Sequence, residues 1–126
     1  MNRLFALDFS FEILDIKRFH DVSYVDTLMD IAVTCDGFAG KMQMEIDYAD
    51  LCAFVQNLKT LYDRLAGAAE IKEPWGNQAY IRFECDRTGH IVITGKLNEM
   101  ENCLKFRKTI DQTDMKEFIN SFGESL

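Results

Sequence analysis

The stretch CDGFAGKMQMEIDYADLCAFVQNLKTLYDRL, residues 35–65, decides the fold of this chain. It opens with Asp36-Gly37, a pair that tolerates the positive φ angles of a tight hairpin turn. Residues 38–46 then alternate apolar and polar side chains, which predicts a strand with one buried face. Asp47 follows at a position suited to an N-cap, so the hairpin strand is expected to pass directly into a helix.

The rest of this stretch predicts an amphipathic helix over about residues 48–66. Apolar side chains recur at i, i+3, i+4 and i+7 spacing. They are Leu51, Phe54, Val55, Leu58, Leu61, Tyr62 and Leu65. Asp50 lies in the first turn, where its charge is favourable near the helix dipole, and Gly67 is suited to end the helix. One face of this helix is therefore expected to cover a sheet.

Strands are predicted on the N-terminal side of this stretch. Residues 4–17 alternate with period two, which predicts one strand half buried on one side. Its buried face is expected to carry Phe5, Leu7, Phe9, Phe11 and Ile13. The apolar parity changes after Ile13, and a β-bulge near Leu14 would account for this change. The next predicted strand, residues 26–35, has Met29, Ile31, Val33 and Cys35 on its inner face.

More strands and a second helix are predicted on the C-terminal side. A short strand over residues 68–73 is a candidate, and further strands are predicted over residues 78–85, 90–97 and 104–110. A final amphipathic helix is predicted over about residues 112–123, capped by Asp111 or Thr113. Short connections favour antiparallel pairing. The predicted fold is a single α+β domain, residues 1–126, with an antiparallel β-sheet of about six or seven strands covered by two amphipathic helices.

Composition limits the classes of function. No apolar run approaches the ~18 residues of a membrane span, and the first residues lack the order of a signal peptide, so a cytoplasmic protein is expected. The four cysteines and two histidines lack metal-ligand spacing, and no nucleotide-binding glycine motif occurs. Neither a metal nor a cofactor is therefore predicted. Neither histidine stands in a catalytic motif, and no catalytic residue is predicted.

The net charge of −7 is concentrated in the N-terminal part of the chain. Residues 1–73 contain 7 basic and 13 acidic residues, whereas residues 74–126 contain 7 and 8. An acidic body argues against nucleic-acid binding, which needs a basic surface. It fits either solubility alone or a basic protein partner, whose association electrostatic steering would accelerate.

Five residues are candidates for partner binding. Asp21, Asp26, Asp30 and Asp36 form the densest group of one sign. They are interpreted either as a solvated strand edge that discourages aggregation or as an interface for a basic partner. Trp75 lies in a loop bounded by proline and glycine. It is interpreted either as an interface anchor or as a side chain folded back over the sheet edge.

Three segments resemble those of the WapI-like immunity proteins. They are Gly37-Phe38-Ala39-Gly40 leading into a strand, Asp50-Leu51 with Phe54 and Leu58 in a helix, and Ile110-Asp111-Gln112-Thr113 followed by Met115 and Phe118. The segment 89–95 lies between them, and the resemblance covers about residues 30–120. It implies a small cytosolic protein that is not an enzyme and that neutralises a toxin domain, often a nuclease, by blocking its active site or substrate groove. The resemblance assigns no binding residues.

Two other functions are compatible with the sequence. One is a small-molecule-binding or enzymatic α+β domain, which a deep pocket lined by His20 or His90 and carboxylates would support. The other is a structural or regulatory subunit that dimerises through Trp75 and the sheet edge. The expected assembly is a monomer or a weak homodimer, with a basic toxin domain as partner and without nucleic acid or membrane.

Overall fold

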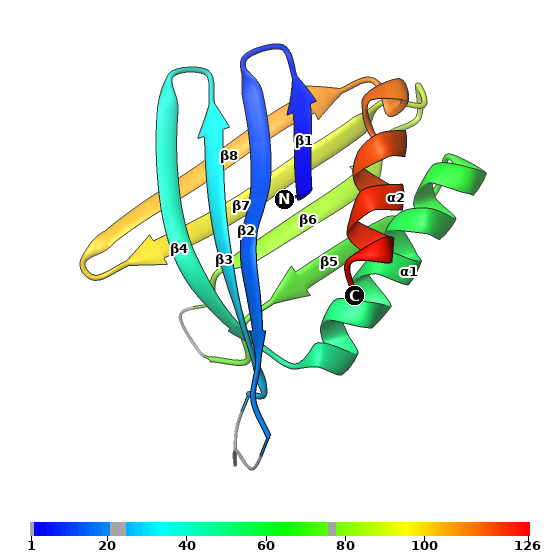
Figure 1. Ribbon diagram of the computed structural model, residues 1–126. Helices are drawn as coiled ribbons and strands as arrows, with labels where there is room; N and C mark the ends of the chain where they lie inside the picture. Colours follow the sequence, from blue (N-terminus) through cyan, green and yellow to red (C-terminus); the bar gives the residue numbers. More distant parts are fainter. Residues whose placement is uncertain (1, 21–24, 76–77) are drawn as a thin grey trace.

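The computed structural model describes residues 2–20, 25–75 and 78–126, and Figure 1 shows its arrangement. Within these residues the chain forms eight strands and two α-helices. In chain order the elements are β1 (Asn2–Ala6), β2 (Phe9–Arg18), β3 (Thr27–Cys35), β4 (Phe38–Ile46), α1 (Tyr48–Arg64), β5 (Ala68–Lys72), β6 (Tyr80–Cys85), β7 (Ile91–Glu99), β8 (Asn102–Ile110), a 3₁₀ turn (Gln112–Asp114) and α2 (Lys116–Glu124). The α+β class with two helices is confirmed.

The strands form two antiparallel sheets instead of the one sheet of six or seven strands that was predicted. The N-terminal sheet has the order β1-β2-β3-β4, and the C-terminal sheet has the order β5-β6-β7-β8. Figure 1 shows the two sheets crossing, with α1 and α2 together along one side. Helix α1 packs beside β5, and α2 packs beside β1. Helix α1 separates the first four strands from the last four in the chain, and each set of four forms its own sheet.

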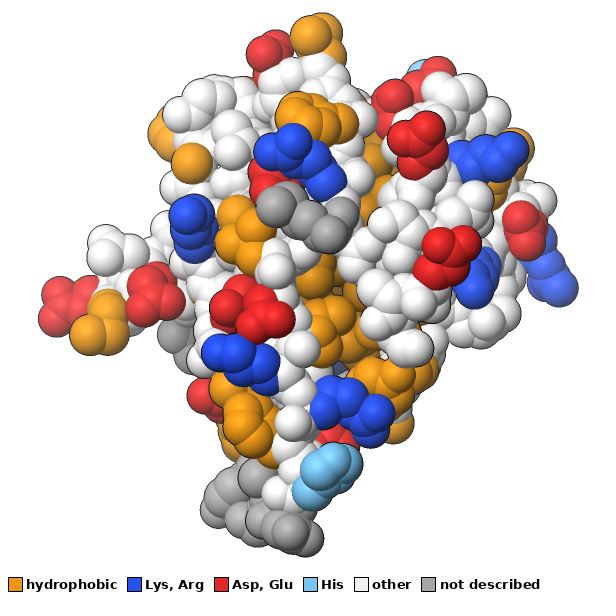
Figure 2. Space-filling model, in the orientation of Figure 1, with side chains coloured by type: hydrophobic (Ala, Val, Ile, Leu, Met, Phe, Trp, Pro, Cys, Tyr) orange, Lys and Arg blue, Asp and Glu red, His pale blue; other side chains and the backbone are white. Residues whose placement is uncertain are grey.

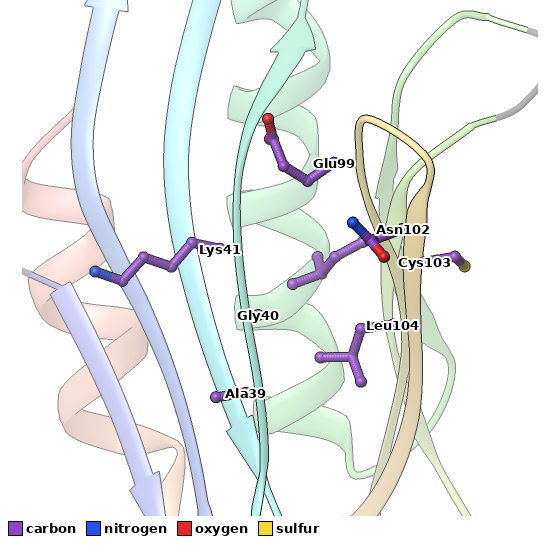
Figure 3. A pocket seen from close by; sticks show the side chains of 8 residues that line it. Ala39, Gly40, Lys41, Glu99, Asn102, Cys103 and Leu104 are labelled. Carbon is purple, nitrogen blue, oxygen red and sulfur yellow. The ribbon is translucent and has the colours of Figure 1, made fainter.

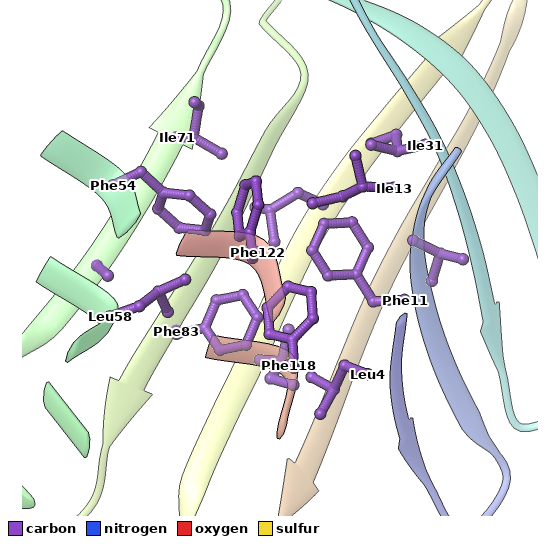
Figure 4. Packing of buried hydrophobic residues seen from close by; sticks show 14 of the residues in the cluster. Leu4, Phe11, Ile13, Ile31, Phe54, Leu58, Ile71, Phe83, Phe118 and Phe122 are labelled. Carbon is purple, nitrogen blue, oxygen red and sulfur yellow. The ribbon is translucent and has the colours of Figure 1, made fainter. Parts of the chain in front are cut away.

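One hydrophobic cluster joins the sheets and both helices, as Figure 4 shows. The Phe118 ring on α2 lies 5.7 Å from the Phe11 ring of the N-terminal sheet and 6.4 Å from the Phe83 ring of the C-terminal sheet. Phe54 on α1 lies 5.9 Å from Phe83. Such ring pairs contribute beyond their buried area, so these four side chains hold all the layers together.

The N-terminal segment differs from the single strand predicted over residues 4–17. Leu7 and Asp8 form a two-residue turn between β1 and β2, and Asp8 has φ 56°. The turn reverses the chain, so Leu4 is buried while Phe5 and Leu7 are 58% and 85% exposed. Aspartate tolerates positive φ well, but the unbroken alternation concealed this turn. The predicted bulge is confirmed by a register shift between Ile13 and Asp15.

The stretch that decided the prediction folds largely as expected. Asp36 and Gly37 have φ angles of 51° and 91° and close the β3–β4 hairpin. Five residues of the predicted stripe on α1 are buried: Leu51, Phe54, Val55, Leu58 and Leu61. Leu65 is 41% exposed because it ends the helix in the left-handed conformation. Phe38 was expected to face inward, but it is 68% exposed at the end of its sheet.

The helix caps differ in part from the prediction. Asp47 occupies the N-cap position of α1 but makes no side-chain cap. Asp26 supplies this cap from the start of β3, because its Oδ1 accepts a hydrogen bond from the Tyr48 backbone N–H at 2.8 Å. At the second helix Asp111 caps the 3₁₀ turn, accepting from the Thr113 backbone N–H at 2.9 Å. Both carboxylates satisfy backbone donors that the helical pattern leaves unpaired.

Candidate functional site

The structure spreads the predicted acidic group along β3 instead of gathering it. Asp21 lies outside the described residues. Asp26 and Asp36 flank opposite ends of β3 and are separated by about 34 Å of extended chain at ~3.4 Å per residue. Each described member also has a partner within the chain. Asp26 caps α1, Asp30 Oδ1 accepts from Gln43 Nε2 at 2.9 Å, and Asp36 forms an ion pair with Lys108 at 2.5 Å.

Two of these carboxylates, Asp26 and Asp36, have structural roles. Hydrogen bonds from the Tyr48 backbone and the Thr27 hydroxyl hold the pKa of Asp26 below its usual value. The Asp36 carboxylate hydrogen-bonds Lys108 and raises the pKa of that ammonium group. The Asp36–Lys108 pair links the two sheets, since Lys108 lies on β8. Asp30 instead accepts a hydrogen bond from the uncharged amide of Gln43.

Trp75 is held at the edge strand of the N-terminal sheet. Its indole Nε1 donates to Glu45 Oε2 on β4 at 2.9 Å, and its side chain remains 36% exposed. The loop is fastened by Glu73, a buried carboxylate that accepts from the backbone N–H groups of Glu45 (2.9 Å) and Ala79 (3.3 Å). These contacts match the interpretation of Trp75 as folded over the sheet edge, with part of the ring accessible.

A groove runs between β4 and the β7–β8 hairpin, as Figure 3 shows. It has a volume of about 290 Å³. Its lining residues are Ala39, Gly40, Lys41, Leu97, Glu99, Asn102, Cys103 and Leu104. A shallower depression beside it, of about 360 Å³, brings Asp30 and Gln43 together with Glu99. Asp30 and Glu99, a carboxylate from the other sheet, thus line the same depression.

These contacts define one candidate surface. The β4-side surface consists of Asp30, Gln43, Glu45, Trp75 and Glu99, and the exposed Lys41 lines the same depression. Its three carboxylates outnumber this one cation, and a partly exposed indole completes it. Glu45 and Glu99 were not among the predicted residues. Glu45 joins through its hydrogen bond to Trp75, and Glu99 joins because the β7–β8 hairpin approaches β4.

The outer face of the C-terminal sheet carries an excess of basic residues. Cross-strand pairing aligns Lys72 with Tyr80, Tyr80 with Lys96, and Lys96 with Lys105. We call these four residues the lysine row. Their neighbours in sequence Ile71, Ile81, Leu97 and Phe106 are buried, so the row faces outward. Beside the row, Arg82 forms ion pairs with Glu70 and Glu84. The outer face of the N-terminal sheet, seen in Figure 2, mixes both signs, and its β4 side carries the carboxylates of the β4-side surface.

The histidines do not form the pocket that an enzymatic site would need. His90 is exposed in the β6–β7 turn, where its Nδ1 lies 2.6 Å from Thr88 Oγ1 and its backbone N–H donates to Asp86 Oδ1 at 3.0 Å. The Thr88 hydroxyl also donates to Asp86 Oδ1 at 2.7 Å, and this bond is the largest cause that holds the pKa of Asp86 below its usual value, followed by the backbone N–H groups of Thr88 and His90. His20 is exposed at the end of β2. The His90 network is an Asx-type turn that shapes the chain reversal.

A model of the immunity protein WapI-like family matches residues 6–126. No curated protein matches the chain. None of the helices within the described residues is long and apolar enough to cross a membrane.

Proposed function

Because the chain belongs to the WapI-like immunity protein family, we propose that it is a non-enzymatic inhibitor that binds a basic toxin domain through its acidic surface. Family membership supports toxin neutralisation in general. The charge distribution supports the finer proposal. Carboxylates gather on the β4-side surface, while the lysine row occupies the outer face of the other sheet.

Asp30 and Trp75 are the central contacts in this proposal. Asp30 lines the same depression as Glu99, and Trp75 donates a hydrogen bond to Glu45, so each predicted residue is accompanied by a carboxylate that was not predicted. A partly exposed tryptophan beside carboxylates fits an interface anchor, since tryptophan is enriched among the residues that dominate binding energy. Asp21, Asp26 and Asp36 extend the proposed acidic region to both ends of β3. Asp26 and Asp36 combine this with the structural bonds described above.

The proposed mechanism is occlusion. A toxin that acts on a polyanion presents a basic groove, and carboxylates at phosphate-like positions would fill that groove and exclude the substrate. A nuclease is the toxin type that fits this mechanism best. The protein is proposed to act in the cytoplasm, where such a toxin meets its substrate.

A small-molecule site is the less favoured alternative. The groove between β4 and the β7–β8 hairpin is at the lower limit of the ~300–1,000 Å³ typical of ligand sites. Its ionisable lining groups are Lys41, Glu99 and Cys103, and neither histidine is among them. This lining lacks the pairing of a base with an orienting group that nucleophilic catalysis needs.

The test uses the toxin domain encoded directly upstream of this gene. Co-expression should rescue cells from this toxin, and the two proteins should purify as a complex. Asp30→Lys should lower the association rate constant several-fold at low ionic strength, with a smaller effect above ~0.15 M salt. Lys105→Glu, on the opposite face, is the matched control and should leave the rate unreduced. Absence of both rescue and complex refutes the proposed function.

A further inference from the structure

The turn between β7 and β8 contains a residue that its conformation disfavours. Glu99 pairs with Asn102, so Met100 and Glu101 form a two-residue hairpin loop. Met100 has φ 56°. Glycine, asparagine and aspartate are the usual residues with positive φ in such loops, because a Cβ with a longer side chain is crowded there. The sequence thus keeps a strained methionine where a better turn residue is available.

Packing does not explain this methionine. Its side chain is 93% exposed, the most exposed large hydrophobic residue among those described. Leu7, the other exposed large hydrophobic residue in a two-residue hairpin loop, does not have positive φ; the exposed loop residues Asp8 and Asp36 do, but they are of a type that tolerates it. Strain without burial at one position indicates a role in contact with another molecule.

The position of the turn suits such a contact. Figure 1 shows the β7–β8 turn projecting beyond the edge of the N-terminal sheet, and Figure 2 shows acidic side chains on both sides of a hydrophobic one at this protrusion. The flanking residues Glu99 and Glu101 are both exposed. An apolar tip between two carboxylates is complementary to an apolar pocket with a cationic rim.

The hairpin is also fixed relative to the β4-side surface. A Cβ at Gly40 would lie 2.9 Å from Leu104 Cδ2 and 3.4 Å from Leu97 Cδ1, so glycine lets the hairpin approach β4 closely. The Asn98 backbone N–H also lies 3.4 Å from Met42 Sδ. Because Glu99 belongs to both the turn and the β4-side surface, a partner that covers one reaches the other.

We infer that Met100 is an interface anchor that enters an apolar pocket of the toxin domain, where basic residues at the rim pair with Glu99 and Glu101. This inference rests on the proposed function and names its central contact. A preorganised turn loses little freedom on binding, which favours a long-lived complex. Methionine suits this role because its flexible, polarisable side chain fills irregular apolar gaps.

The test measures binding kinetics of the purified toxin domain to four forms of the full chain. Met100→Gly should keep or raise the melting temperature, since glycine fits the turn, while the dissociation rate constant rises about tenfold or more. The double variant Glu99→Lys/Glu101→Lys should mainly lower the association rate constant at low salt. Leu7→Ser is the matched control and should bind as the wild-type protein does.

The outcomes separate this inference from the proposed function. If the wild-type protein binds the toxin and Met100→Gly binds equally well, the anchor is refuted and the proposed function stands. If the wild-type protein does not bind, both fail. If Met100→Gly instead abolishes a homodimer of the isolated protein in sedimentation velocity, the turn serves self-association and the toxin-anchor assignment is overturned.

Discussion

Replacing Gly95 with alanine tests how the hairpin that carries Met100 is built. Gly95 lies in β7, opposite Ile81 on one side and Phe106 on the other. A Cβ at this position would lie 2.4 Å from Phe106 Cζ and 2.5 Å from Phe106 Cε1, and 3.0 Å from the Tyr80 carbonyl oxygen. The Phe106 ring covers the glycine backbone, so the absent side chain is part of the packing.

The cost of this substitution follows from the overlap. Nonbonded carbon atoms prefer separations of about 3.5–4.0 Å, so the Phe106 ring has to retreat by more than about 1 Å. Its neighbour Phe9, with ring centroids 6.1 Å away, would lose contact. Overpacking of this kind lowers the free energy of unfolding by about 1–3 kcal/mol. Alanine also reduces the conformational entropy of the unfolded chain, which stabilises the folded protein by about 0.4–1 kcal/mol. We expect a net loss of about 1–2 kcal/mol, or roughly 3–10 °C in Tm for a chain of this length.

Urea and thermal unfolding followed by circular dichroism measure this loss. The double variant Gly95→Ala/Phe106→Leu is the control, because leucine lacks the ring atoms that the new Cβ would meet. It should be more stable than the sum of the two single effects predicts, by about 1 kcal/mol or more. A Gly95→Ala protein as stable as the wild type, or a double-mutant cycle without coupling, would show that the ring does not depend on the glycine.

Two further predictions concern charge. Asp26→Ala should lower the urea midpoint at pH 7. Because the pKa of Asp26 is lowered in the folded protein, its stabilising contribution is complete above the unfolded pKa of about 3.9 and is lost as the pH falls through the folded pKa. An equal difference between the variant and the wild type at pH 7 and in strong acid would contradict the capping role. Lys105→Glu places a carboxylate opposite Lys96 and should raise the free energy of unfolding by about 0.2–1 kcal/mol, with a smaller increase in ~1 M salt. A variant less stable than the wild type would contradict repulsion within the lysine row.

Local patterns predicted the elements better than their assembly. The Asp36-Gly37 turn, the stripe on α1 and the bulge after Ile13 depend on neighbouring residues, and all three are confirmed. The turn at Leu7–Asp8 was missed because apolar alternation continued through it. The division into two sheets was missed because alternation shows which face of a strand is buried and does not identify the strand beside it.

The candidate site is formed by segments that are distant in the chain, whereas each helix or strand is determined mainly by neighbouring residues. The sequence placed Asp26, Asp30 and Asp36 on one acidic strand, but their partners Tyr48, Gln43 and Lys108 lie 13 to 72 residues away in the chain. No pattern in one sequence reveals which carboxylates are already occupied. Met100 was passed over because it lies between the strands predicted over residues 90–97 and 104–110, and the residue type alone does not show its positive φ.

The distribution of charge has a consequence for the direction from which a partner approaches. A net charge of −7 suggests a uniformly acidic protein, yet the strand register aligns Lys72, Lys96 and Lys105 on one outer face. Like charges in register destabilise a sheet, and they also repel a basic toxin. Under the proposed function, a basic partner would be attracted to the β4-side surface and the Met100 turn and repelled by the lysine row. This asymmetry would bias the orientation in which the toxin first meets the inhibitor, without contact between the lysine row and the toxin.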